Sequence, residues 1–241
     1  MFSMKLHRFI GNFNLSQKEV EITNPENIKQ IKNVLRLKKS EKIILSDGKG
    51  QEAEVVIDFL SNEKIIGIVN KIDEPASAEA LSVVKQVNLY LAILKKENFE
   101  WAVQKAVECG ISKIIPIITE RTIKTGLNIA RLEKIILEAS EQSGRNIVST
   151  LSPILDFKDA IAHGGNASVD EKIIFHLVAN PYIPEKKAKN AIIFIGPEGG
   201  FTEKEVGLAK NAGFSVASLG SLTLRGETAA IIGTYRTVYS V

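Results

Sequence analysis

Two different spacings of apolar residues divide the chain. From Lys5 to Ile72, apolar and polar residues mostly alternate, which indicates strands at Leu6–Phe13, Glu19–Thr23, Lys42–Ser46, Glu52–Leu60 and Lys64–Ile72. One helix is expected at Pro25–Leu37, because Asn24 suits an N-cap and proline suits the first position. The turn Asp47-Gly48-Lys49-Gly50 predicts that Ile43–Leu45 pairs antiparallel with Ala53–Ile57. Residues 1–73 are therefore predicted to form a small β-barrel.

The spacing changes after Glu74–Ala80, a stretch that lacks apolar alternation and carries a proline, so we expect a linker there. Beyond it, predicted strands lie at Asn88–Leu94, Ile114–Ile118, Ile173–Ala179, Ile192–Ile195 and Val216–Leu219. Predicted helices lie at Phe99–Cys109, Ile129–Ser143, Phe157–His163 and Gly226–Tyr239, and a further one starts after Thr202. Alternating strands and helices predict an α/β domain over residues 80–241, with a mostly parallel sheet covered on both faces.

One local plan occurs twice near the end of the chain. An apolar strand is followed by the glycine turn Gly196–Gly200 and a helix capped by Thr202 and Glu205, and a second strand is followed by the turn Gly220–Arg225 and a helix. We expect both turns at the carboxyl ends of neighbouring buried strands, where open α/β sheets bind ligands. Neither turn has the Rossmann or P-loop pattern. A tight strand-to-helix turn needs glycine whatever it binds, so a purely structural role stays open.

Three charged residues accompany these turns. Arg225 is expected to face the same cleft as Glu198, and a cation beside a carboxylate suits a polar or anionic ligand. Glu227 has a structural explanation as well, since a helix N-terminus favours an acidic residue.

Composition describes an ordinary globular chain of 241 residues, with 44% hydrophobic and 24% charged residues. No apolar run reaches the ~20 residues of a membrane span, and Met1–Gly11 lacks the apolar region of a signal peptide, so we expect a cytoplasmic protein without membrane contact. The single cysteine, Cys109, has no zinc-ligand spacing with His7, His163 or His176, and no metal site is expected.

Positive charge is concentrated in one stretch, although the net charge is only +3. Between residues 29 and 42, a single acid, Glu41, stands among six basic residues: Lys29, Lys32, Arg36, Lys38, Lys39 and Lys42. A solvated helix face and a phosphate-binding surface explain this cluster equally well.

Five motifs together resemble a known family: IGPEGGFTEKEV, LGSLTLRGETA, EQSGRN, ITERT and NVLRLKKSEKI. They are similar to the bacterial ribosomal RNA small-subunit methyltransferase E family, of the SPOUT class of S-adenosylmethionine-dependent methyltransferases. The resemblance covers nearly the whole chain, in the family's order. It implies methylation of N3 of a uridine in 16S rRNA, uridine 1498, within the 30S subunit. It also implies an N-terminal PUA-like barrel that binds RNA, a C-terminal domain with a deep trefoil knot, and a homodimer with its active site at the subunit interface.

The resemblance also implies site residues. Glu198, Arg225 and Glu227 would lie nearest the reacting groups. The S-adenosylmethionine pocket would be formed by Leu177, Val178, Ala179, Asn180, Ile195, Gly196, Pro197, Glu198, Gly199, Gly200, Leu219, Gly220, Leu222 and Leu224. RNA would be bound by Arg8, Arg36, Lys38, Lys95, Arg121, Arg145 and Asn146.

Four positions depart from the family pattern. The family usually has arginine at Leu222, threonine at Gly226, histidine at Gln30 and arginine at Asn33. Two alternatives therefore stay open: a non-catalytic RNA-binding protein with a degenerate transferase domain, and a SPOUT methyltransferase that acts on another RNA.

Overall fold

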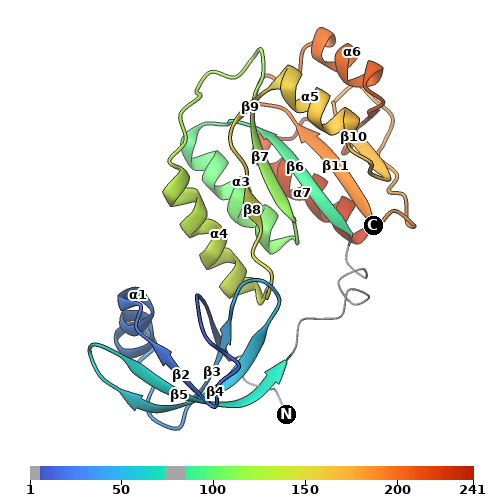
Figure 1. Cartoon of the computed structure of the whole chain (residues 1–241). Helices are drawn as coiled ribbons and strands as arrows, with labels where there is room; N and C mark the ends of the chain where they lie inside the picture. Colours follow the sequence, from blue (N-terminus) through green and yellow to red (C-terminus); the bar gives the residue numbers. More distant parts are fainter. Residues whose placement is uncertain (1–5, 74–84) are drawn as a thin grey trace. The chain divides into compact units, whose positions relative to one another are not determined.

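The computed structural model describes residues 6–73 and 85–241, which form two compact units (Figure 1). The first unit contains residues 6–73 and Ser140–Val148, and the second contains residues 85–139 and 149–241. The expected linker at Glu74–Ala80 lies outside the described residues. The predicted second domain, residues 80–241, includes Ser140–Val148, whereas in the structure this segment packs with the first unit.

The first unit is built on a five-stranded sheet in the order β1-β3-β4-β5-β2. Its strands are β1 (His7–Ile10), β2 (Glu19–Ile22), β3 (Lys42–Ser46), β4 (Glu52–Leu60) and β5 (Ile65–Asp73). The predicted hairpin is confirmed, because Ile43 lies opposite Val55 and Leu45 opposite Ala53 in an antiparallel ladder. β1 joins β3 in parallel. No ladder joins β1 to β2 within the described residues, so closure of the sheet into a barrel stays a prediction.

The helix of the first unit differs from its prediction. Asn24 caps it as expected and accepts hydrogen bonds from two backbone N–H groups, but α1 spans only Pro25–Lys29. The chain then widens into a π-helical turn, η1 (Gln30–Val34). Arg36 has a φ of 55°, a left-handed conformation that ends the helix before Leu37. This departure lies within the basic cluster of residues 29–42.

Segment Ser140–Val148 is held to the first unit by the hairpin turn between β3 and β4. Gly50 N–H donates to the Asn146 carbonyl at 2.9 Å, and Val148 N–H donates to the Gly48 carbonyl at 2.9 Å. The Asn146 side chain donates to the Gly50 carbonyl at 3.3 Å. Glu141 accepts the Ile10 N–H at 2.7 Å. These hydrogen bonds explain why a segment far along the chain belongs to the N-terminal unit.

The second unit contains a parallel sheet in the order β12-β10-β11-β6-β7-β8, with β9 also paired to β7. Its strands are β6 (Gln86–Ala92), β7 (Lys113–Ile118), β8 (Thr150–Leu151), β9 (Leu155–Asp156), β10 (Glu171–Phe175), β11 (Asn190–Ile195) and β12 (Ser215–Ala217). The prediction that the two glycine turns follow neighbouring strands is wrong, since β10 lies between β11 and β12. Three strand ends therefore meet at this edge, rather than two.

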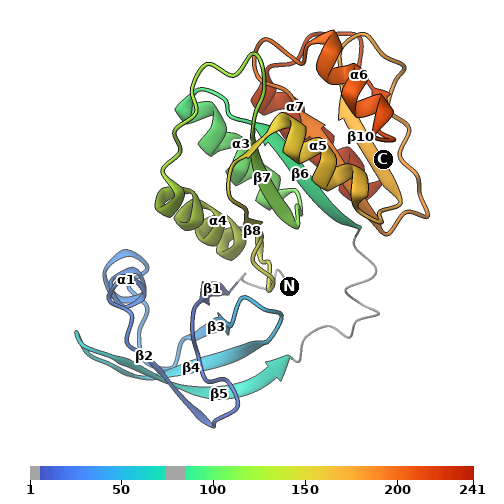
Figure 2. The same ribbon diagram turned by 45° about the horizontal axis from the view of Figure 1, so that its top comes forward.

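Helices cover both faces of this sheet, as predicted. They are α3 (Lys96–Glu108), α4 (Ile129–Ser143), α5 (Phe157–Asn166), α6 (Glu203–Asn211) and α7 (Gly226–Tyr239). Helices α5 and α6 pack together on one face, and α3 and α7 pack together on the other (Figures 1 and 2). Within the described residues, no helix is long and apolar enough to cross a membrane.

The core beneath α5 and α6 is aromatic. Tyr90 of β6 stacks on Phe194 of β11, with ring centroids 4.3 Å apart, and Phe214 meets Phe194 edge-on. The Tyr90 hydroxyl lies 2.6 Å from Nδ1 of His163, and burial raises the pKa of Tyr90 to about 12. This packing fixes β11 in the middle of the sheet and so fixes the glycine turn that follows it.

Candidate active site

A cavity of about 310 Å³ lies at the carboxyl ends of β10, β11 and β12. Three segments form its walls: the residues after β10, the glycine turn after β11 and the turn after β12. Twelve of the fourteen residues predicted for the cofactor pocket line it: Leu177, Val178, Ile195, Gly196, Pro197, Glu198, Gly199, Gly200, Leu219, Gly220, Leu222 and Leu224. Ala179 and Asn180 are not among its lining residues.

The wall after β10 is a loop that leaves the sheet and returns to it. His176 N–H donates to the Ala217 carbonyl, and Ser218 N–H donates to the Asn180 carbonyl at 2.8 Å. Between these two attachments, Val178 is 83% exposed. The Asn180 carbonyl thus holds the loop against the segment after β12, while Leu177 and Val178 of the loop line the cavity.

The glycine turn after β11 is held from several directions. Gly200 N–H donates to the Pro197 carbonyl at 2.8 Å, and Gly200 has a φ of 68°. Glu198 Oε1 accepts the Lys95 N–H at 3.1 Å. Thr202 and Glu205 form the predicted capping box at the start of α6. The turn therefore has a fixed backbone with the Glu198 side chain at the cavity wall.

The turn after β12 is more open. Leu222 is 77% exposed at the cavity, and Gly220 has a φ of 146°. Its far end is tightly packed, because a Cβ atom at Gly226 would lie 2.7 Å from Leu94 Cδ2 and 3.4 Å from the Gly196 carbonyl oxygen. The start of α7 therefore packs closely against the first glycine turn at Gly226. In this structure the position has room for glycine, where the family usually has threonine.

The three predicted catalytic residues are placed differently. Glu198 lines the cavity. Arg225 is the exposed N-cap residue of α7, and its side chain caps no N–H group and does not line the cavity. Glu227 is only 5% exposed, and its Oε2 has no hydrogen-bond partner among the described residues. The structure thus brings one of the three to the cavity wall.

The predicted RNA-binding residues also divide into groups. Arg36 and Lys38 are exposed, with no side-chain ion pair to a described residue. Arg8 is paired with Glu52, and both side chains are mostly buried. Three others make hydrogen bonds within the protein: the Lys95 N–H donates to Glu198, the Arg145 side chain to the Ile147 carbonyl, and the Asn146 side chain to the Gly50 carbonyl. Arg121 lines the cavity of the second unit.

Sequence reasoning did not assign seven lining residues to the pocket: Arg121, Phe175, His176, Phe201, Thr223, Gly226 and Ala229. Most adjoin a predicted segment, so extending each segment by a residue or two would have found them. Arg121 is different, since it follows β7, which is separated from β11 by β6. Its position after a strand end in the motif ITERT was the available signal.

Electrostatically, the cavity wall carries few charges. Among its lining residues, only Glu198 and Arg121 carry a formal charge. In residues 6–73 and 85–241 no group of three or more His, Cys, Asp or Glu side chains is placed to hold a metal ion, and the expectation of no metal stays a prediction. A largely apolar hollow with glycine backbone and two opposite charges suits a small organic ligand with polar ends.

Comparisons with known proteins agree with this arrangement. Residues 82–236 match the family model of an RNA methyltransferase domain, and residues 22–73 match that of an RNA methyltransferase PUA domain. The ribosomal RNA small subunit methyltransferase E of Rickettsia conorii is 30% identical over 95% of this chain and 93% of its own. The protein of that name from Mesomycoplasma hyopneumoniae is 37% identical over 61% of this chain and 66% of its own length.

A solved structure extends the likeness to three dimensions. The ribosomal RNA small subunit methyltransferase E of Neisseria gonorrhoeae, determined with S-adenosyl methionine bound, has a TM-score of 0.82 and 31% sequence identity, with 95% of each chain covered. The fold is thus an α/β methyltransferase domain preceded by a PUA-like domain. On the family models and the full-length relative together, this chain belongs to the ribosomal RNA small subunit methyltransferase E family.

Proposed function

We propose that this protein transfers a methyl group from S-adenosylmethionine to N3 of a uridine in 16S rRNA, uridine 1498 by family resemblance. The observation that carries the proposal is the cavity of about 310 Å³ formed by three segments after β10, β11 and β12. Ligand pockets of small molecules begin at about 300 Å³ and combine apolar walls with a few polar groups. The name and bound ligand of the Neisseria gonorrhoeae relative support the same assignment.

The residues present fit S-adenosylmethionine. Leu177, Ile195 and Leu224 offer apolar surface for a flat ring. A Cβ atom at Gly196 would lie 3.2 Å from Phe201 Cδ2 and 3.3 Å from Gly200 backbone atoms, so the chain is already closely packed there. Glycine in this turn leaves backbone amide and carbonyl groups accessible to a ligand. Glu198 adds a carboxylate that can attract the ligand's positive charge.

When bound, S-adenosylmethionine supplies an activated methyl group, so the protein's task is to align the acceptor nitrogen and to exclude water. The proton on uridine N3 must also leave. We assign Arg225 to the stabilisation of the uridine oxygen beside N3, because it is exposed and makes no side-chain hydrogen bond to a described residue. Glu198 suits the acceptance of the proton better than Glu227, because Glu198 is exposed at the cavity and Glu227 is 5% exposed.

The RNA would be held partly by the first unit. Of the predicted RNA-binding residues that lie between residues 6 and 73, Arg8 is paired with Glu52, whereas Arg36 and Lys38 are exposed and form no ion pair with a described acid. Lys32, Lys39 and Lys42 of the same basic cluster contact Asn62, Asp58 and Glu54. We therefore propose that phosphate contacts concentrate on Arg36 and Lys38, within a cytoplasmic 30S subunit.

The finer features of the fold are also proposals. A deep trefoil knot is supported by the way the loop after β10 is attached to Ala217 and Ser218, beside the turn after β12. A homodimer is supported by the exposed aromatic residues of α7, since Tyr235 and Tyr239 are 50% and 51% exposed, and by Trp101 of α3, 46% exposed. Light scattering of the purified protein tests the second; a monomer at micromolar concentration would contradict it.

Mass spectrometry of 16S rRNA nucleosides tests the function. A strain lacking this protein should lose N3-methyluridine, and the purified protein should restore it on 30S subunits from that strain. Retention of the modification in the deletion strain would favour another RNA substrate. Absence of S-adenosylmethionine binding in calorimetry would favour the non-catalytic alternative, in which Leu222 and Gly226 mark decay.

The Arg225→Ala variant tests the assigned role. We expect its turnover on 30S subunits to fall by about 100-fold, the typical effect of removing one donor that stabilises developing charge. Its thermal stability should be unchanged, because the side chain makes no hydrogen bond to a described residue. Normal turnover would show that another group stabilises the uridine oxygen.

A further inference from the structure

We propose that Arg121 is a positioning residue of the cofactor pocket, which holds the first glycine turn in its binding conformation. This inference rests on the proposed function, because it assigns a role within the same pocket. It differs from the role implied by the family resemblance, which places Arg121 among the residues that contact RNA.

The contact between Arg121 and the turn is direct. The guanidinium Nη1 donates to the Gly199 carbonyl oxygen at 2.6 Å. The aliphatic part of the side chain covers the same residue, since a Cβ atom at Gly199 would lie 3.2 Å from Arg121 Cδ and 3.4 Å from Arg121 Cβ. Arginine therefore both binds the turn and packs on it, and the absence of a side chain at 199 makes room for this.

The hydrogen bond fixes one peptide plane from both ends. The peptide that carries the Gly199 carbonyl also carries the Gly200 N–H, which donates to the Pro197 carbonyl at 2.8 Å. Because a peptide unit is planar, a donor on its oxygen and an acceptor on its N–H together set its orientation. This orientation is compatible with the positive φ of 68° at Gly200, where the chain turns towards the N-cap of α6.

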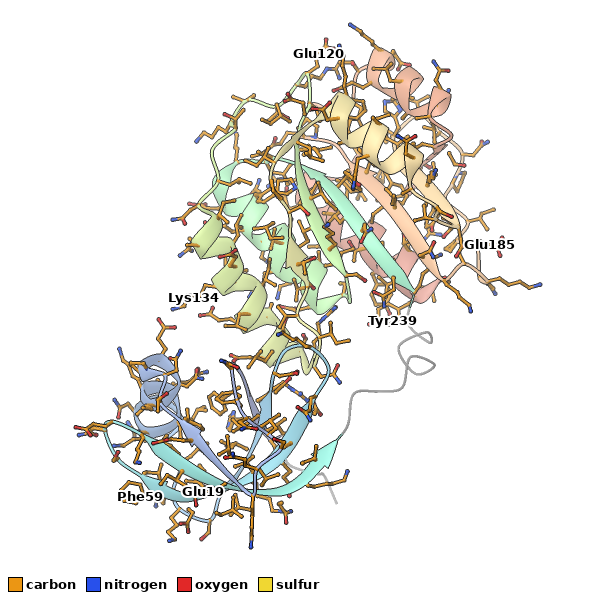
Figure 3. All side chains as sticks on the ribbon, in the orientation of Figure 1. Glu19, Phe59, Glu120, Lys134, Glu185 and Tyr239 are labelled. Carbon is orange, nitrogen blue, oxygen red and sulfur yellow. The ribbon has the colours of Figure 1, made fainter. Side chains whose placement is uncertain are left out.

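Arg121 can act this way because its own segment is anchored. Thr119 N–H donates to Thr122 Oγ1 at 2.9 Å, which closes a local turn around residue 121. Glu120 N–H donates to Oε1 of the buried Glu205 at 2.9 Å. Glu120 is labelled in Figure 3 on the loop after β7, at the same end of the second unit as α6. The loop after β7 and helix α6 are therefore joined to each other, and together they support the glycine turn between β11 and α6. We call these two segments the frame of the first turn.

The other side of the turn has a comparable attachment. Glu198 accepts the Lys95 N–H, from the connection between β6 and α3. Residues 198 and 199 are therefore held by segments that follow two different strands, β6 and β7. Since a pocket ordered before binding does not lose that conformational freedom on binding, loss of Arg121 should weaken the cofactor complex.

The experiment uses the full-length protein and calorimetry with S-adenosylmethionine in the absence of RNA. Arg121→Met keeps the aliphatic packing and removes the donor; we expect its Kd for S-adenosylmethionine to rise about tenfold, the usual scale for one hydrogen bond to a charged group. Arg121→Lys keeps a charged donor and should recover affinity to within about threefold of the natural protein. In methyl-transfer assays the KM for S-adenosylmethionine should rise in Arg121→Met while kcat changes by less than about twofold.

Lys124→Met is the matched control. Lys124 is an exposed base in the same loop, forms no ion pair with a described residue, and does not line the cavity. Its loss should leave the Kd for S-adenosylmethionine unchanged. An unchanged Kd in Arg121→Met, together with weaker 16S rRNA binding, would overturn the inference and make Arg121 an RNA contact. Failure of the natural protein itself to bind S-adenosylmethionine would instead contradict the proposed function.

Discussion

The two glycine turns of the second unit begin from the same sequence plan and end in different structures. The turn at Gly196–Gly200 is held by Lys95, Arg121 and its own capping box. The turn at Gly220–Arg225 has an exposed Leu222 at its middle and an N-cap residue, Arg225, without a capping hydrogen bond. The first turn is thus held by contacts with other segments of the domain, whereas Leu222 and Arg225 of the second turn are exposed to solvent.

This difference suggests that the two turns have different roles. A fixed turn loses little conformational freedom when a ligand binds, which favours it as the binding wall for a cofactor. Arg225, exposed in the other turn and not part of the cavity lining, makes no capping hydrogen bond, which is consistent with its proposed contact with an RNA base. The comparison predicts that changes in the frame of the first turn cost stability and cofactor affinity, whereas changes beside the second turn leave the fold intact.

The largest effect on stability is expected for Glu205→Ala. Glu205 is 4% exposed and accepts the N–H groups of Thr202 and Glu120. Its loss would leave two donors without their partner and remove half of the capping box, which together cost about 3 kcal/mol of unfolding free energy. Chemical denaturation monitored by circular dichroism measures this loss.

Glu203→Ala is the control for that measurement. Glu203 lies in the same first turn of α6 but is exposed, and only its favourable interaction with the helix dipole is lost. We expect a cost of about 0.5 kcal/mol. Equal losses in the two variants would show that the frame around the first turn contributes no more than surface charge does.

A smaller effect is expected for Gly200→Ala. No atom lies within 4 Å of the added Cβ, so the cost comes only from the φ of 68° and amounts to about 1–2 kcal/mol. The same substitution at Gly207, inside α6 and also without a near atom, should stabilise the protein by about 0.5–1 kcal/mol. Denaturation curves of the two variants should therefore shift in opposite directions. A shift in the same direction would mean that the first turn relaxes and is not held as its contacts indicate.

Much of the fold was predictable because its signals are local. The bounds of α4 and α7 and the capping box at Thr202 follow from periodicity, caps and glycine stops, and the structure has them as predicted. Features set by tertiary contacts were not predictable in this way. Nothing near Gln30–Val34 signals a π-helical turn, and strand order, which puts β10 between β11 and β12, depends on packing across the whole sheet.

The candidate site shows the same limit. Family motifs indicated the three walls of the cavity, because each wall is a continuous stretch of sequence. They did not indicate that Arg121 reaches Gly199, because that contact joins residues far apart in the chain and depends on how two loops meet. They also did not separate Glu198 from Glu227, since burial of a carboxylate is a property of the folded domain.

The smallest effect at neutral pH is expected for Tyr182→Phe, near the second turn. Tyr182 N–H donates to the Ser218 carbonyl at 2.8 Å. Its hydroxyl forms a hydrogen bond with the Thr237 side chain and lies 3.4 Å from the Glu171 carboxylate. Phenylalanine keeps the backbone bond that supports the strand before the second turn. We expect a loss of about 0.5 kcal/mol of unfolding free energy at pH 7, the lower end for one hydrogen bond, because the Glu171 contact is long and only the Thr237 hydrogen bond is lost. The Kd for S-adenosylmethionine should be unchanged.

The same variant should become the more stable protein in alkaline solution. Burial raises the pKa of Tyr182 from 10.0 to about 12, so the folded protein holds the phenol proton that the unfolded chain releases. This contribution to stability is complete below pH 10 and is lost as the pH rises towards 12. At pH 11 the natural protein should therefore lose about 1 kcal/mol that Tyr182→Phe keeps, measured as the difference between their urea unfolding free energies at pH 7 and pH 11. Tyr90, whose pKa is raised in the same way, is present in both proteins and cancels. Parallel losses in the two proteins would show that the phenol of Tyr182 reaches solvent, and that the strand leading to the second turn is looser than its backbone hydrogen bonds indicate.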